Sequence, residues 1–100
     1  MQRCIIACRN CQLQMPKHHP CALCCYDCEQ ICKFNLNVEV NNIFLDISLL
    51  DLCINACNLC ILECSKHMAH HLVCKECVDA CKACIIECQK AKMEALQDTS

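Results

Sequence analysis

Apolar positions in this chain recur three and four residues apart, and cysteine fills many of them. In residues 74–89, CKECVDACKACIIECQ, the cysteines are Cys74, Cys77, Cys81, Cys84 and Cys88. Alternation of three and four is the heptad rhythm, in which apolar side chains form the buried seam between packed helices. At 3.6 residues per turn, these five side chains fall within an arc of about 80°. The pattern therefore predicts a helix with one face of thiols.

Three earlier segments carry the same spacing. Their cysteines are Cys4, Cys8 and Cys11; Cys21, Cys24, Cys25, Cys28 and Cys32; and Cys53, Cys57, Cys60 and Cys64. The second of these groups spans about 100° of arc and the third about 60°. A loose C-x3-C-x2-C unit is thus used four times along the chain. The repeat predicts four helices that each present thiols on one side.

Breaks between the groups predict the helix boundaries. Pro16 and Pro20 end the first helix near Met15 and let the second begin at Pro20, because proline is tolerated in a first turn. Residues 35–42, NLNVEVNN, are rich in asparagine and β-branched residues and predict a loop.

The second half of the chain follows the same scheme. We expect a third helix over residues 43–67, capped by Asn41 or Asn42, and a fourth that ends near Leu96. The turn between them lies at 67–71, HMAHH. Four helices with short links favour an all-α fold, an antiparallel four-helix bundle with a cysteine-lined core.

Composition fits this fold and indicates one domain, residues 1–97, with a polar tail at 98–100. The 100 residues include 17 cysteines, two prolines and no glycine, which argues against a turn-rich β protein or a small disulfide-laced fold. On the third helix, apolar residues flank the thiols on both sides. They are Leu52, Ile54, Leu59 and Ile61. This apolar arc is wider than one bundle seam needs, which indicates burial against another protomer.

Charge and motif content exclude several function classes. A net charge of −2 and only three aromatic residues predict no nucleic-acid binding. No run approaches the ~20 apolar residues of a membrane span, so we expect no membrane association. The cysteine pattern begins at Cys4 and leaves no room for a signal peptide, which predicts a cytosolic protein with reduced thiols. No Ser-His-acid constellation or glycine loop is present, so we expect no enzyme.

The thiols have several conceivable uses. Plain packing does not require 17 cysteines, since alanine, valine or leucine fill cores without the risk of oxidation. A disulfide scaffold leaves one thiol over, and many facing pairs in a bundle lie beyond the reach of a disulfide. Thiolates select soft metal ions, namely Cu(I), Zn(II) or the iron of iron–sulfur clusters. Zinc and iron–sulfur sites use a few clustered ligands, whereas these thiols run along whole helix faces.

Cu(I) suits a continuous thiol lining best, because two or three thiolates satisfy each ion. Side chains four residues apart on a helix have Cβ atoms about 5–6 Å apart, so both sulfurs reach one ion. The sequence therefore favours a store or buffer for many Cu(I) ions. An iron–sulfur or thiol redox electron-transfer protein, or a zinc-binding structural protein, remains the alternative.

The segment LDLCINACNLCILECSKHMAHHLVCKECVDACKACIIECQK resembles the cysteine-rich four-helix-bundle copper storage proteins of bacteria, and CALCCYDCEQIC is similar to the family's second helix. The resemblance implies a homotetramer of bundles that each hold many Cu(I) ions in a thiol-lined core. It also implies a cytosolic location for members without an export signal. The first helix departs from the family, because it is short and has few cysteines. The copper donor and acceptor are not implied.

Histidines and methionines gather at the predicted breaks. They are Met15, His18, His19, His67, Met68, His70 and His71. In an up-down-up-down bundle both breaks lie at one end, where we expect these ligands to form the opening by which copper enters. We expect Leu36, Phe44, Leu49 and Leu50 to close the other end. The predicted metal ligands are the 17 cysteines together with His67, Met68, His70 and His71. Of the last four, His67 continues the inward register from Cys64.

Overall fold

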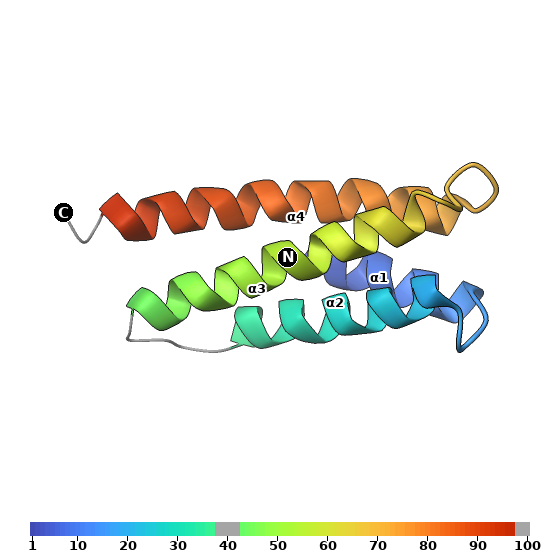
Figure 1. The fold of residues 1–100 in the computed structure, drawn as a ribbon, viewed down its shortest axis with the longest axis horizontal. Helices are drawn as coiled ribbons and strands as arrows, with labels where there is room; N and C mark the ends of the chain where they lie inside the picture. The colour runs from blue at the N-terminus through green and yellow to red at the C-terminus, as the bar shows by residue number, and fades with distance from the viewer. Residues whose placement is uncertain (38–42, 98–100) are drawn as a thin grey trace.

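The computed structural model of the protein consists of four α-helices. It describes residues 1–37 and 43–97, with side chains described from residue 46 onward in the second range. The helices are α1 (Gln2–Gln14), α2 (Pro20–Asn37), α3 (Ile43–Cys64) and α4 (Leu72–Gln97). Successive helices run in opposite directions and form an elongated body of 47 × 20 × 17 Å (Figure 1). The predicted antiparallel four-helix bundle is confirmed.

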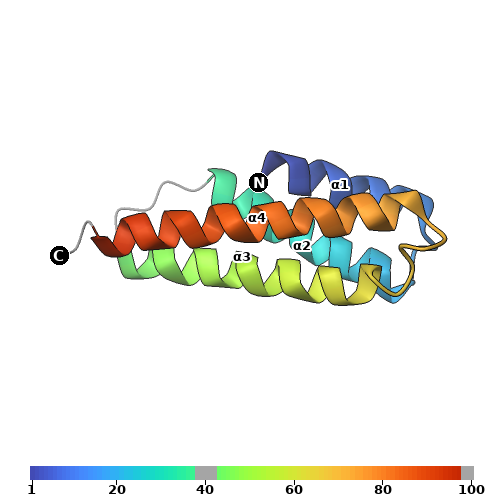
Figure 2. The same cartoon turned by 90° about the horizontal axis from the view of Figure 1, so that it is seen from above.

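The four helices surround one central axis. α1 packs against α2 and α4, and α3 packs against the same two helices from the opposite corner. α1 and α3 lie on opposite sides of the bundle (Figure 2). Within the described residues, the backbones of diagonal helices have no Cα atoms within 8 Å of each other, but their thiols meet at the centre, as Cys4 and Cys57 do. Sixteen of the 17 cysteines are buried there. The heptad spacing has therefore produced a core built mainly from thiols, as predicted.

The first link joins α1 to α2 at the predicted residues. Met15 leaves the helix in an extended conformation, and Pro20 opens the next helix. The carbonyl of His19 accepts the first helical hydrogen bond, from the Leu23 amide at 3.1 Å. His19 is thus the N-cap, which leaves proline at the first helical position, where its missing N–H costs nothing.

Two predicted boundaries were wrong by about one turn. α2 continues through Asn35 to Asn37 instead of ending before residue 35, and the Asn35 amide donates to the carbonyls of Ile31 and Leu49, both at 3.1 Å. These bonds hold the asparagine within the helix and tie it to α3. The predicted caps Asn41 and Asn42 and the tail at 98–100 lie outside the described residues.

The third helix ends at Cys64 and not at the predicted His67. The amide of His67 donates to the Cys64 carbonyl at 3.0 Å, a bond that tightens the last turn and closes the helix. His67 therefore lies in the link, outside the helical register that was expected to carry it inward. α4 begins at Leu72 and ends at Gln97, one residue beyond the prediction.

The two ends of the bundle differ. Both short links, residues 15–19 and 65–71, lie at one end, which we call the link end; we call the opposite end the far end (Figure 1). α1 has 13 residues and α4 has 26, so they are about 20 and 39 Å long. α1 therefore covers only the half of the bundle nearer the links.

α3 combines a core face with an apolar outer face. The stretch Asp46–Cys64 is long and apolar enough to cross a membrane by length and composition, with a mean hydropathy of 1.6, contrary to the expectation from the sequence. Its four cysteines contribute to that value and lie in the bundle core. Leu52 and Leu59 are exposed, whereas Ile54 and Ile61 pack against the core.

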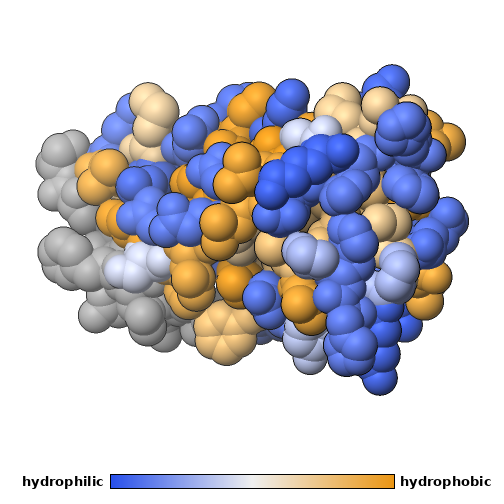
Figure 3. All heavy atoms as spheres, turned by 45° about the vertical axis from the view of Figure 1, so that its right-hand side comes forward, coloured by the Kyte–Doolittle hydropathy of each residue, from blue (hydrophilic) through white to orange (hydrophobic). Residues whose placement is uncertain are grey.

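The outer surface is mixed in polarity. Hydrophilic residues gather over the link end, and apolar residues interrupt the surface toward the middle of the molecule (Figure 3). Glu29, although charged, is only 4% exposed. Its carboxylate accepts from Lys33 Nζ at 2.6 Å and from Gln12 Nε2 at 2.8 Å. The second contact joins α1 to α2.

Candidate metal centre

The core thiols form four layers along the bundle axis, which we number from the link end. In each of the first three layers every helix supplies one cysteine. The first layer is Cys11, Cys21, Cys64 and Cys74; the second is Cys8, Cys25, Cys60 and Cys77; and the third is Cys4, Cys28, Cys57 and Cys81. The fourth is Cys32, Cys53 and Cys84, with Cys88 beyond it.

Sulfur atoms within each layer are in contact. The Sγ–Sγ distances range from 2.8 Å (Cys21–Cys64) to 3.9 Å (Cys21–Cys74) in the first layer. They are 3.4 to 3.7 Å in the second, 3.7 to 3.9 Å in the third, and 3.4 and 3.9 Å in the fourth. Adjacent layers also touch, for example Cys25 and Cys64 at 3.7 Å. The thiols therefore form one continuous sulfur lining.

Matched spacing on antiparallel helices produces the layers. Cys4 and Cys8 on α1 contact Cys81 and Cys77 on α4, both at 3.7 Å. The interval of four residues is the same on both helices but runs in opposite directions. Each step along one helix is therefore matched by an equal step along its neighbour, about 1.5 Å per residue.

Burial and neighbouring sulfurs shift the thiol pKa values in both directions. Burial, followed by the nearby Cys11, raises the pKa of Cys74 to about 11. A hydrogen bond from Cys32 stabilises the thiolate of Cys28 and lowers its pKa to about 6. Hydrogen bonds, first with Cys25, raise the pKa of Cys8. Since metal binding needs thiolates, it must release protons from this network and should strengthen as the pH rises.

Several quartets of buried thiols are preformed as ligand sets, with their four sulfurs all within 4.8 Å of one another. One is the third layer, and another is Cys25, Cys60, Cys64 and Cys77. Quartets share members, as Cys25 and Cys64 also belong to the set with Cys11 and Cys21. Shared thiolates packed without intervening apolar side chains suit clusters of soft ions.

Comparison with protein families agrees with the metal-binding character of the thiol core. Residues 1–93 match the family described as copper storage protein. The chain belongs to the copper storage protein family. This membership identifies copper as the cargo and the protein as non-enzymatic, and it confirms the resemblance seen in the sequence. No curated protein and no solved structure matched the chain.

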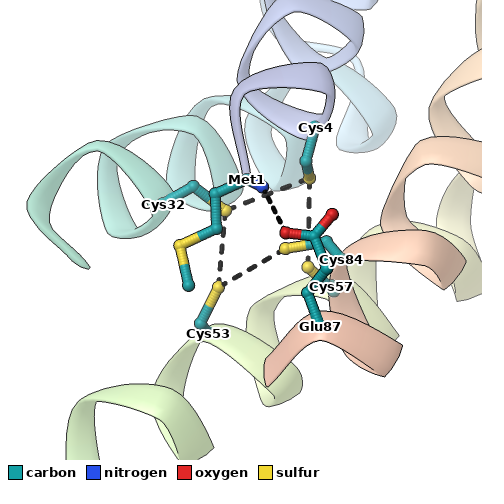
Figure 4. A network of polar contacts seen from close by, with 7 residues as sticks. All are labelled: Met1, Cys4, Cys32, Cys53, Cys57, Cys84 and Glu87. Carbon is teal, nitrogen blue, oxygen red and sulfur yellow. Dashed lines mark hydrogen bonds and ion pairs between the residues drawn. The ribbon is translucent and has the colours of Figure 1, made fainter. Parts of the chain in front are cut away.

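In this copper storage protein, a methionine occupies the α1 position of the fourth layer. Met1 packs against the core and lies beside Cys32 and Cys53 (Figure 4). Its amine donates to Glu87 Oε2 at 2.9 Å, which fixes the start of α1 against α4. Met1 is not among the ligands predicted from the sequence. Its spacing of three residues before Cys4 continues the thiol register and was the signal that could have found it.

Cys24 stands apart from the other cysteines. It is partly exposed and lines a groove of about 300 Å³ between α2 and α3, together with Leu52 and Leu59. Adjacent residues on a helix point about 100° apart, so Cys24 and Cys25 cannot both face the axis. Burial raises the pKa of the Cys24 thiol. The structure does not bring this predicted ligand to the sulfur lining.

The histidines and methionines of the two links lie together at the link end, as expected, but to different depths. Met15 is buried, and His19 and His67 are half-buried with ring centroids 4.6 Å apart. The others are exposed: His18, Met68, His70 and His71. The pair of imidazoles from the two links thus lies between the exposed ligands and the first thiol layer, next to Cys21 and Cys64 in the chain.

His19 has a structural task of its own. Its Nδ1 accepts a hydrogen bond from the Cys21 amide at 3.1 Å, so a neutral ring carries its proton on Nε2. Nε2 of His19 could bind a metal only after losing its proton, and Nδ1 only after losing its hydrogen bond to the Cys21 amide. His67 has no such bond in the described part of the chain and is the more available ligand of the two. At the far end, Leu50 is buried and Leu36 is exposed, while the Phe44 side chain lies outside the described residues.

Proposed function

We propose that this member of the copper storage family is a cytosolic store or buffer that holds many Cu(I) ions on its core thiolates. The observation that carries the proposal is the continuous lining of 16 buried cysteines. A dedicated catalyst or electron carrier needs one activated thiol or one cluster. A lining with many overlapping ligand sets is instead suited to holding many ions at once.

Charge balance supports Cu(I) as the stored form. Each Cu(I) that replaces one thiol proton leaves the core neutral, so filling does not accumulate buried charge. Two or three thiolates satisfy each ion, and the Sγ–Sγ contacts of 2.8 to 4.0 Å let neighbouring ions share ligands. A reducing cytosol would keep these thiols available for metal.

We assign storage to the 16 core cysteines, with the Met1 thioether as a neighbouring soft donor at the start of α1. Ions would enter at the link end, where His67, Met68, His70 and His71 are weaker ligands that can pass copper to the first thiol layer. Cys24 is left out of the stored set because it faces the outer groove. A substitution test follows from this division. Cys24→Ala should leave the Cu(I) capacity unchanged, and a capacity lowered by this substitution would place Cys24 in the stored set.

The resemblance implies a homotetramer, and the surface supports assembly of the bundles. Leu52, Leu59 and Leu62 of α3 are 48%, 59% and 61% exposed, an unusual run of leucines on one helix. Native mass spectrometry of the intact chain would test this part. A monomer at micromolar concentration would remove it without affecting storage.

Anaerobic titration of the reduced metal-free protein with Cu(I), followed by metal analysis, tests the function. We expect a stoichiometry comparable to the number of core thiols. One or two ions per chain, or an iron–sulfur chromophore in protein purified from cells, would instead favour the redox alternative. A zinc-dependent structural protein would be a coil without metal. Far-UV circular dichroism of the reduced metal-free protein should show helix instead.

A further inference from the structure

The third thiol layer has the geometry of a closed tetrahedral metal site. Each of its four ligands comes from a different helix and is at most 1% exposed. The recorded Sγ–Sγ distances are 3.7, 3.7, 3.7 and 3.9 Å for the pairs Cys4–Cys28, Cys4–Cys81, Cys28–Cys57 and Cys4–Cys57. Zn–S bonds of about 2.3 Å in a regular tetrahedron require sulfurs about 3.8 Å apart. These four distances match the requirement, and all four sulfurs of the layer lie within 4.8 Å of one another.

The other layers fit a tetrahedral ion less well. In the first layer, Cys21 lies 2.8 Å from Cys64 but 3.9 Å from Cys74, so the four sulfurs are unevenly spaced. Three of the recorded distances in the second layer are 3.4 or 3.5 Å, too short for the tetrahedron. The fourth layer has Met1 where a thiol of α1 would stand (Figure 4).

We propose that the third layer binds one Zn(II) when the protein is free of copper. Four mutually close thiolates that surround one point are the ligand set of structural zinc, whereas Cu(I) needs only two or three. Binding converts four thiols and one Zn(II) into a tetrathiolate complex and four released protons. The complex carries two negative charges, and Cys32, which donates to Cys4 Sγ at 3.9 Å, supplies one hydrogen bond to it.

The role of this ion would be to hold α1 in the empty protein. The buried residues of α1 are three cysteines and Ala7, so its docking buries little hydrocarbon. Cys4 lies in its first turn, and a metal bond there would join that turn to the three other helices. Incoming Cu(I) would displace the zinc, because thiolates prefer the softer ion and the copper-loaded core is neutral. This inference goes beyond copper storage and does not depend on it.

Anaerobic titration of the metal-free full chain with Co(II), a spectroscopic substitute for Zn(II), tests the site. The first equivalent should give the ligand-field bands of a tetrahedral tetrathiolate and should be displaced by Zn(II). Cys28→Ser should weaken the first ion by at least about tenfold, a loss of about 1.4 kcal/mol. Cys88→Ser is the matched control, since Cys88 is as buried as Cys28 but lies beyond the fourth layer. It should change the affinity by less than about threefold.

Two results of the titration would overturn the proposal. One is equal weakening by Cys28→Ser and Cys88→Ser, which would mean that the ion samples the whole lining. The other is a first ion bound no more tightly than later ones. Hydrogen exchange of the wild-type protein provides a test that needs no variant. One equivalent of Zn(II) should slow exchange in residues 2–8, and unchanged exchange there contradicts the proposal. The Cu(I) capacity is measured in a separate titration, so that the storage function is tested independently of the zinc site.

Discussion

The link end and the far end of this bundle are closed by different chemistry. At the link end, His19 and His67 meet at 4.6 Å above the first thiol layer, and four further soft or borderline ligands lie exposed around them. Away from the link end, ion pairs join Met1 to Glu87, where α1 begins near the middle of the bundle, and Lys92 to Asp51 (Figure 1). The link end presents exchangeable metal ligands, and the rest of the bundle presents contacts that hold helices together. Copper exchange should therefore respond to changes at the link end, whereas bundle stability should respond to the contacts between helices along the rest of the bundle.

The largest effect is expected from removing the ligands of the link end. Alanine at His67, Met68, His70 and His71 together should slow Cu(I) loading by about tenfold, equivalent to a barrier raised by about 1.4 kcal/mol. The final capacity should hardly change, since the 16 core thiols remain. Stopped-flow loading from a chelated Cu(I) donor measures the rate. Loading at the wild-type rate would mean that these residues are ordinary solvated link residues.

The complementary change is in the core. Cys60→Ala combined with Cys81→Ala removes two of the 16 buried thiols, one from the second layer and one from the third. Capacity should fall in proportion to the thiols lost, while the initial loading rate stays close to that of the wild type. Metal analysis after anaerobic loading gives the capacity. A slower initial rate would contradict the assignment of ion entry to the link end.

A smaller effect is expected from Glu29, which helps to attach α1 in the half nearer the links. Burial alone would raise the pKa of this carboxyl, but the hydrogen bonds from Lys33 and Gln12 outweigh it and hold the pKa below its ordinary 4.5. Glu29→Gln should lower the unfolding free energy of the metal-free protein by about 1 kcal/mol at neutral pH. Urea unfolding measures this loss.

The sign of the Glu29 effect with pH follows from linkage. Because the folded pKa is depressed, the stabilisation is present above the unfolded value of 4.5 and is lost as the pH falls through the folded pKa. The stabilities of the wild type and Glu29→Gln should therefore converge in acid. A gap that stays constant between neutral and acid pH would show that packing, and not the carboxylate charge, explains the difference.

The smallest effect belongs to the far end. Lys92→Met breaks the ion pair with Asp51, whose side chain is 46% exposed, and should change the unfolding free energy by less than about 1 kcal/mol. Loading kinetics should not change, because the pair lies away from the links. The same stopped-flow assay checks this. A loading defect comparable to that of the link-end variant would remove the distinction between the two ends.

The sequence by itself determined the helices and the direction of most thiols. Spacing of three and four fixes the angle of a side chain on its own helix, so the inward faces and the bundle could be predicted. Pro16 and Pro20 fixed the first link for the same local reason. Even the outward direction of Cys24 was present in the spacing, since it immediately precedes the inward-facing Cys25.

Only the tertiary structure decided which thiols meet. Spacing on one helix does not set how far that helix slides along its neighbour, and a slide of one turn would pair different cysteines. The layers depend on packing between helices, as do the place of Met1 beside Cys32 and the contact of His19 with His67. Helix ends without proline or glycine were also beyond local reasoning. Asn35 stays helical because its side chain donates to the Leu49 carbonyl on the next helix. This bond joins residues that are 14 positions apart in the chain.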